Sequence, residues 1–184
     1  MDNWEMDNRE MDNWEKRVAA VWASFDDYDG REDEFRALVD TLAAELPEGD
    51  PAAAFERACA WDSTDRSDLA VPLYRQALDT GLAGYSRRRA VIQMSSSLRN
   101  IGQVDTAIGL LEAERAIDPA TLDEQTRTLD DAISAVLALC LAHAGREREA
   151  VSIAVAALAP HLPRYQRSMT NYARELIEPE DSAA

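Results

Sequence analysis

The chain has 184 residues and a formal net charge of −16 at pH 7, with 46% hydrophobic and 29% charged residues. A chain this negative repels nucleic acid and anionic lipid, so we expect neither as a partner. No apolar run approaches the ~20 residues that a membrane helix needs, and the acidic start has neither the basic nor the apolar region of an export signal.

Residues 1–15 consist of three tandem pentads, each beginning with Met-Asp-Asn and ending with Glu. A period of five matches neither helix nor strand, so we expect this segment to bury no face of its own. One interpretation is a reiterated translation start. The other is that Trp4 and Trp14, set among acids, belong to a linear peptide that docks elsewhere. We assign residues 1–14 to an N-terminal extension.

From about Asn13 onward, apolar residues recur every three or four positions, which predicts amphipathic helices. Alanine and leucine dominate and β-branched runs are scarce, so we expect no strands. Glycine and proline divide the pattern into pairs of helices. We predict a helical domain over residues 15–178 and a tail over 179–184. The domain contains four helical hairpins and a capping helix, at about 15–48, 50–83, 86–119, 129–162 and 165–177.

The first hairpin turns at the acidic segment 26–30, and its second helix ends at Pro47. Asp50 then caps the first helix of the second hairpin, with Pro51 at the first helical position, where a missing N–H costs nothing. The third hairpin turns at Gly102, which supplies a left-handed residue between its two helices. A longer polar connection then leads to the fourth hairpin.

Aligning the hairpins on their turns places the same kinds of residue in the same places. The turn positions are Gly30, Asp65, Gly102 and Gly145, and the positions five residues later are Phe35, Ala70, Ala107 and Ala150. The period lengthens from about 35 to about 43 residues, which is typical of a helical solenoid.

The third hairpin resembles the tetratricopeptide repeat most closely. Six residues occupy the places of that motif: Ser95, Leu98, Gly102, Ala107, Leu111 and Pro119. Glu114 departs from the small residue usual at its place, so we expect looser or shifted packing there. Five longer segments also resemble the bacterial group 5 type of this family: 55–59, 70–75, 88–93, 97–100 and 162–168. The resemblance implies an all-α, right-handed α-solenoid of about four hairpins plus a capping helix, without an established activity.

In such a fold the first helix of each pair lines a concave groove. The motif then predicts a peptide-binding groove formed by Phe55, Arg89, Ile92, Gln93, Ser96, Arg99 and Asn100. Arginines beside an apolar floor suit an acidic peptide or a C-terminal carboxylate, through forked hydrogen bonds. The alternative is that Arg87, Arg88 and Arg89 are a solvated helix start that pairs with nearby acids.

Catalytic chemistry finds no support in the sequence. His143 and His161 belong to no metal-spaced cluster, and no phosphate-binding loop is present. We therefore predict no catalytic residue, metal or cofactor, and not an enzyme. Cys59 and Cys140 fall in different hairpins and are interpreted as reduced, buried thiols of a cytoplasmic protein rather than a disulfide.

The predicted function is that of a non-catalytic scaffold that binds a protein or peptide, with an acidic partner favoured. The alternative is a self-associating structural protein, in which the acidic N-terminal segment or a helix face mediates homodimerisation. The terminal helix, with Arg164, Tyr165, Arg167 and Tyr172, is expected to act as a cap on the fourth hairpin rather than as a binding site.

Overall fold

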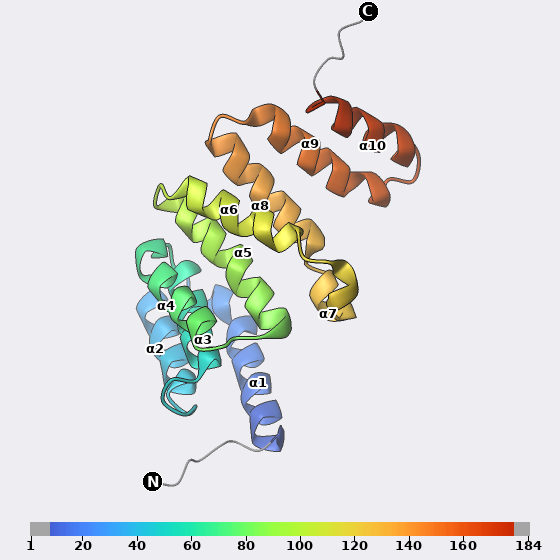
Figure 1. Ribbon diagram of the computed structural model, residues 1–184. Coiled ribbons are helices and arrows are strands. Elements are labelled where there is room, and N and C mark those ends of the chain that lie inside the picture. The colour runs from blue at the N-terminus through green and yellow to red at the C-terminus, as the bar shows by residue number, and fades with distance from the viewer. Residues whose placement is uncertain (1–7, 179–184) are drawn as a thin grey trace, which may run out of the picture. The chain divides into compact units, whose positions relative to one another are not determined.

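A computed structural model describes residues 8–178, and this part of the chain is helical and contains no strand (Figure 1). The chain divides into two compact units at Ala83 and Gly84, and each is described by itself. The first contains α1 (Asn8–Ala23), the short 3-10 helix η1 (Phe25–Tyr28), α2 (Glu32–Ala43), α3 (Pro51–Asp62) and α4 (Ser67–Asp79). The second contains α5 (Gly84–Asn100), α6 (Val104–Arg115), η2 (Pro119–Thr121), α7 (Glu124–Arg127), α8 (Asp130–His143), α9 (Glu147–Leu158), η3 (Ala159–His161) and α10 (Gln166–Glu175).

In the first unit α3 packs between α2 and α4. The Asp50 carboxylate accepts a hydrogen bond from Ala52 N at 2.8 Å, so α3 begins as its capping sequence predicts. The Phe35 ring is fully buried and meets the ring of Phe25 at 4.8 Å and that of Trp22 at 5.1 Å, both edge-on. Edge-to-face contacts of this kind add to the area that the rings bury. An aromatic cluster therefore holds the first hairpin together.

Helix α1 begins at Asn8, five residues before the expected start at about Asn13. Trp14 is only 3% exposed, and its indole N–H donates to the Leu42 carbonyl at 2.8 Å. Trp14 and Val18 are four residues apart and therefore lie on the same side of the helix, in one cluster with Leu42. The expectation that the pentads of residues 1–15 bury no face thus does not hold for Trp14. Residues 1–7, with Trp4, lie outside the described residues.

The turns confirm the alignment of the hairpins. Gly30, Gly102 and Gly145 have φ angles of 72°, 79° and 76°. Asp65, the turn residue of the second hairpin, has a φ of 59°. Aspartate is one of the few residues that tolerate this left-handed conformation. All four hairpins therefore turn through the same backbone geometry, with or without a glycine.

In the second unit α5 packs against α6 and α8, and α8 packs against α6 and α9. The core between them contains fully buried Leu98, Leu111, Ile133 and Leu137. Helix α10 packs on α9, where Ala173 is buried and Ser152 Oγ donates to its carbonyl at 2.6 Å. The terminal helix is thus a cap on the fourth hairpin, as predicted.

Candidate functional site

Six of the seven predicted groove residues lie on α5. They are Arg89, Ile92, Gln93, Ser96, Arg99 and Asn100, and we call them the α5 strip. Their spacing of three or four residues puts them on one side of the helix. Asn100 is exposed and the other five are half-buried, whereas the opposite side of α5, with Val91 and Met94, is buried. The α5 strip is therefore a partly accessible surface.

Phe55, the seventh residue, belongs to α3 of the first unit and not to α5. Its side chain is 2% exposed, and its ring lies 6.2 Å from the ring of Tyr74 on α4. A large aromatic side chain at this place fills the space between α3 and α4. Phe55 is therefore a core residue of the first unit, and the interpretation of it as an accessible groove floor is corrected.

The two arginines of the strip have defined surroundings. The Arg89 guanidinium lies 6.0 Å from the centre of the Tyr85 ring, one turn earlier on the helix. Arg99 Nη2 donates to Asn100 Oδ1 at 3.3 Å. Burial raises the pKa of the Cys140 thiol on α8, and the positive charge of Arg99 acts in the opposite direction. The charge of Arg99 therefore acts on a buried thiol of the neighbouring helix.

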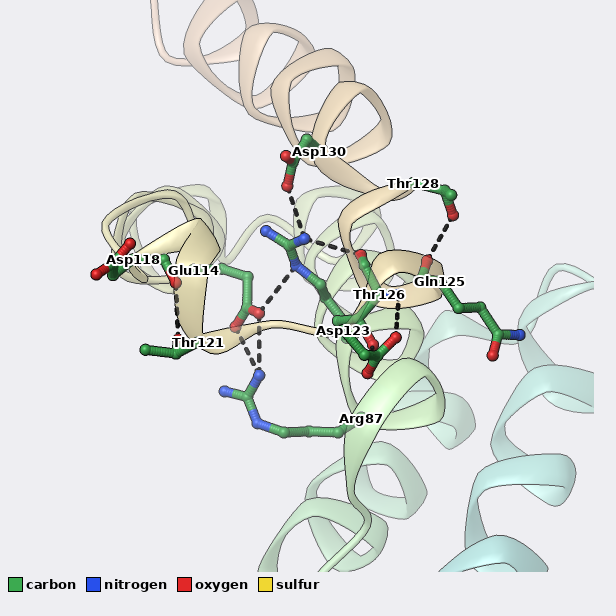
Figure 2. Close-up of polar contacts among 10 residues, drawn as sticks. Arg87, Glu114, Asp118, Thr121, Asp123, Gln125, Thr126, Thr128 and Asp130 are labelled. Atoms are coloured by element: carbon green, nitrogen blue, oxygen red, sulfur yellow. Dashed lines mark hydrogen bonds and ion pairs between the residues drawn. The ribbon is translucent and has the colours of Figure 1, made fainter.

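An ion-pair network with a buried Arg88–Glu114 pair at its centre occupies the start of α5 (Figure 2). Arg88 is 3% exposed, and its Nη1 donates to Asp130 Oδ1 at 2.6 Å and to the Thr126 carbonyl at 2.9 Å. Its Nε lies 3.2 Å from a carboxylate oxygen of Glu114, which is 2% exposed. Arg87 Nη1 donates to both oxygens of that carboxylate, at 3.0 and 2.9 Å. We call the side chains of Arg87, Arg88, Glu114 and Asp130 the Arg88–Glu114 network.

This network revises the interpretation of Arg87, Arg88 and Arg89 as a solvated helix start. Arg87 and Arg88 do pair with acids, but Arg88 is buried and therefore not solvated. Sequence reasoning missed it because the partners lie as many as 42 residues apart along the chain. One signal could have found it: Glu114 stands where the repeat has a small residue, and a buried carboxylate requires a cationic partner.

Arg88 on α5 is hydrogen-bonded to the connection between α6 and α8. Asp123 accepts hydrogen bonds from Thr126 N at 2.8 Å and from Thr126 Oγ1 at 2.7 Å, so it caps the single turn of α7 (Figure 2). These bonds favour the ionised carboxylate and hold the pKa of Asp123 below its ordinary range. With the turn fixed, the Thr126 carbonyl accepts from Arg88. The longer connection predicted here is therefore an ordered part of the second unit.

The end of the second unit carries exposed apolar side chains. Leu139, Val151, Leu158, Tyr165, Tyr172 and Ile177 are all at least half exposed. A cavity of about 330 Å³ lies beside α10, lined by Leu162, Pro163, Arg164, Tyr165 and Met169. Tyr165 adopts a φ of 71°, a left-handed conformation rare for a non-glycine residue. This surface was assigned only a capping role from the sequence.

Within residues 8–178 no group of three or more His, Cys, Asp or Glu residues is placed to hold a metal ion. His161 Nε2 lies 2.8 Å from Asp131 Oδ2 on the surface, and Cys59 and Cys140 are both free and buried. In the same part of the chain, no helix combines the length and the apolar character needed to cross a membrane.

Comparison with known proteins identifies the fold. No curated protein matches the chain. Two crystal structures of a Podosopora anserina protein described as a kinesin light chain, with nearly identical TPR-like repeats, are similar to it. One superimposes with a TM-score of 0.65 at 22% identity, covering 89% of this chain and 91% of that chain. The other, of a point variant of the same protein, has a TM-score of 0.66 at 20% identity, covering 94% and 93%.

At these identities the similarity establishes the fold, which is the predicted all-α helical repeat built of TPR-like hairpins. A protein-family model of the group 5 type, described as tetratrico peptide repeat, matches residues 51–176, more than half of the chain. The chain therefore belongs to the tetratrico peptide repeat family.

Proposed function

We propose that the protein is a non-catalytic scaffold that binds an acidic peptide segment along the α5 strip. Tetratricopeptide repeats are generally protein-interaction scaffolds, which supports the class of function. The arrangement of the α5 strip supports this helix as the binding site. Arg89 and Arg99 flank half-buried Ile92 and Ser96 on one side of α5. Two guanidinium groups beside an apolar side chain can hold carboxylates by forked hydrogen bonds while a leucine or valine of the ligand covers Ile92.

The spacing of the arginines limits the ligand. Arg89 and Arg99 are ten residues apart on α5, which is about 15 Å along the helix axis at 1.5 Å per residue. An extended peptide covers this length in roughly four to five residues at about 3.3 Å each. The proposed ligand therefore carries two acids four or five positions apart, or one acid at that distance before its C-terminal carboxylate, with an apolar residue between them.

A charge-reversal variant tests this proposal. Fluorescein-labelled seven-residue peptides with two glutamates four or five positions apart and a leucine between them are titrated with the full chain, and binding is followed by fluorescence anisotropy. Arg89→Glu with Arg99→Glu should abolish binding while far-UV circular dichroism stays unchanged. Arg115→Glu with Arg127→Glu changes the net charge equally at exposed positions of the same unit and should preserve binding. Equal binding by both double variants would refute the α5 strip as the site.

A cytoplasmic location and a bacterial source belong to the same proposal. The two free, buried thiols Cys59 and Cys140 support the first, because a secreted protein tends to pair its cysteines. The resemblance of five sequence segments to the bacterial group 5 type of the family supports the second.

We also propose self-association through a helix face, as the second candidate function. The supporting observation is the set of exposed large apolar side chains at the end of the second unit, because exposed apolar patches commonly mark interaction sites. Docking by the N-terminal pentads has less support, because Trp14 is already buried within its own chain. The mass of the protein in solution, measured at several concentrations, tests whether it self-associates.

A further inference from the structure

The side of α10 next to its contact with α9 is apolar and exposed. Tyr165 and Tyr172 are seven residues apart and 73% and 59% exposed. Half-buried Met169 and Leu176 alternate with them, so the four residues recur at spacings of four, three and four. Met169 and Tyr172 lie within α10, whereas Tyr165 and Leu176 are the residues that cap its two ends. Spacings of three and four are those of a helix seam that packs against another helix. We call these four residues the α10 seam (Figure 1 shows α10 in red).

The cavity beside α10 gives the seam a shape. It lies at the N-terminal end of the helix between Leu162, Pro163, Tyr165 and Met169, with the aliphatic stem of Arg164 as a further wall. Its volume of about 330 Å³ is ample for one aromatic ring. Tyr172, at the other end of the helix, is such a ring and lies exposed on the same side. The segment from Leu162 to Tyr172 thus carries both an apolar recess and an exposed aromatic side chain.

The unpaired charges at the two ends of α10 are opposite. Arg164 and Arg167 stand at its start and Glu175 in its last turn, and none of the three has an ion-pair partner among the described residues. Arg174, also in the last turn, pairs with Glu178 at 3.0 Å, so that end is negative overall. Each unpaired charge lies at the end of the helix where the helix dipole disfavours it, since the N-terminus attracts anions and the C-terminus cations. These charges therefore do not stabilise α10 itself, but they complement a second α10 that runs in the opposite direction.

We propose that two copies of this chain form a symmetric dimer in which their α10 helices pair antiparallel. This inference rests on the second proposed function and gives it a location. A two-fold axis near Met169 and Thr170 sets Arg164 of one copy opposite Glu175 of the other. The same register sets Tyr172 opposite the gap between Tyr165 and Met169, where the cavity lies. A single register therefore pairs Arg164 with Glu175 and also places Tyr172 at the cavity. Because of the two-fold axis, each of these contacts occurs twice in the dimer.

The alternative arrangements fail on the same residues. A parallel pair would place Arg164 against Arg164 and Tyr172 against Tyr172, leaving both cavities empty. The seam is also short, because the ten residues of α10 extend only about 15 Å. The interface therefore falls at the small end of the range for specific complexes, and the dimer should form reversibly with concentration.

Sedimentation equilibrium of the full chain, from micromolar to millimolar concentration, tests the proposal. The mass should rise from the monomer value of 20.4 kDa toward twice that value. Arg164→Glu and Glu175→Arg should each remain monomeric, because each variant alone faces like charges across the axis. Mixed in equal amounts, the two variants should form a heterodimer, since every facing pair is then again opposite in charge. Both residues are exposed, so circular dichroism should show an unchanged fold.

Tyr172→Ala should abolish the dimer and Tyr172→Phe should retain it. A wild-type chain that stays monomeric at the highest concentration, or single charge variants that still dimerise, would overturn the α10 pairing. Persistent dimers in every α10 variant would leave self-association standing but move it to another surface. Arg89→Glu with Arg99→Glu should dimerise like the wild type, so the peptide-binding proposal and this one fail separately.

Discussion

Replacing Glu114 by alanine should cost the second unit about 3 kcal/mol of unfolding free energy. The Glu114 carboxylate is 2% exposed and neutralises Arg88, which is 3% exposed, across 3.2 Å. Removing one partner of a buried ion pair costs ~3–5 kcal/mol, because the other charge stays buried without compensation. We expect the lower end of that range, since half-exposed Asp130 still accepts from Arg88 at 2.6 Å. The better helix propensity of alanine returns only a few tenths of a kcal/mol.

Urea unfolding followed by far-UV circular dichroism measures this change. For a slope of about 2–3 kcal/mol per molar urea, a loss of about 3 kcal/mol lowers the midpoint by roughly 1–1.5 M. Glu112→Ala is the matched control, because it makes the same substitution on α6 at an exposed position, where the carboxylate lies 3.8 Å from Arg146. Its unfolding free energy should change by no more than about 1 kcal/mol, the most that an exposed ion pair usually contributes.

A double variant separates charge from packing. Arg88→Met with Glu114→Ala removes the buried charges together, so it should be more stable than Glu114→Ala alone, although it has lost more side-chain atoms. If Glu114→Ala and Glu112→Ala unfold at the same urea concentration, the buried pair does not stabilise the unit. If the double variant is the least stable of all, packing rather than charge compensation explains the burial of Arg88.

Two further predictions concern the turns and the acid limb of stability. Gly102→Ala should cost about 1 kcal/mol, because alanine is strained at a φ of 79° although its Cβ would meet nothing within 4 Å. Gly109→Ala, inside α6 with equal space and no positive φ, should instead gain ~0.5–1 kcal/mol, and thermal unfolding of both variants compares the signs. The N–H and hydroxyl of Thr126 hold the pKa of Asp123 below its ordinary value of 3.8. The contribution of the Asp123 carboxylate to the unfolding free energy is therefore fully present above pH 3.8, and it is lost as the pH falls through the lowered pKa. The difference in unfolding free energy between the wild type and Asp123→Asn should therefore shrink steadily below about pH 4, and a constant difference would contradict the assignment.

Local chemistry determined most of the secondary structure. Asp50 and Pro51 begin α3 as their capping pattern predicts, since a cap acts within a few residues of itself. The turn at Gly102 and its equivalent at Asp65 adopt the same left-handed backbone, because a helix end selects this conformation without reference to the rest of the fold. Apolar residues at helical spacing gave the hairpins, and their repetition indicated the family to which the chain belongs.

Only the tertiary structure decided which side chains are accessible and which are paired. Phe55 occupies a groove position in the repeat, yet the packing of α4 against α3 buries it. Trp14 belongs to a five-residue repeat whose period matches neither helix nor strand. Its indole nevertheless donates a hydrogen bond to the Leu42 carbonyl, 28 residues away, and lies in the core. Burial and ion pairing depend on what neighbouring helices bring to the same place, and no pattern within one helix contains that information. The sequence alone therefore determined the repeat, whereas its three-dimensional packing decided that Arg88 is a buried structural charge and that Arg89 and Arg99 remain as the candidate site.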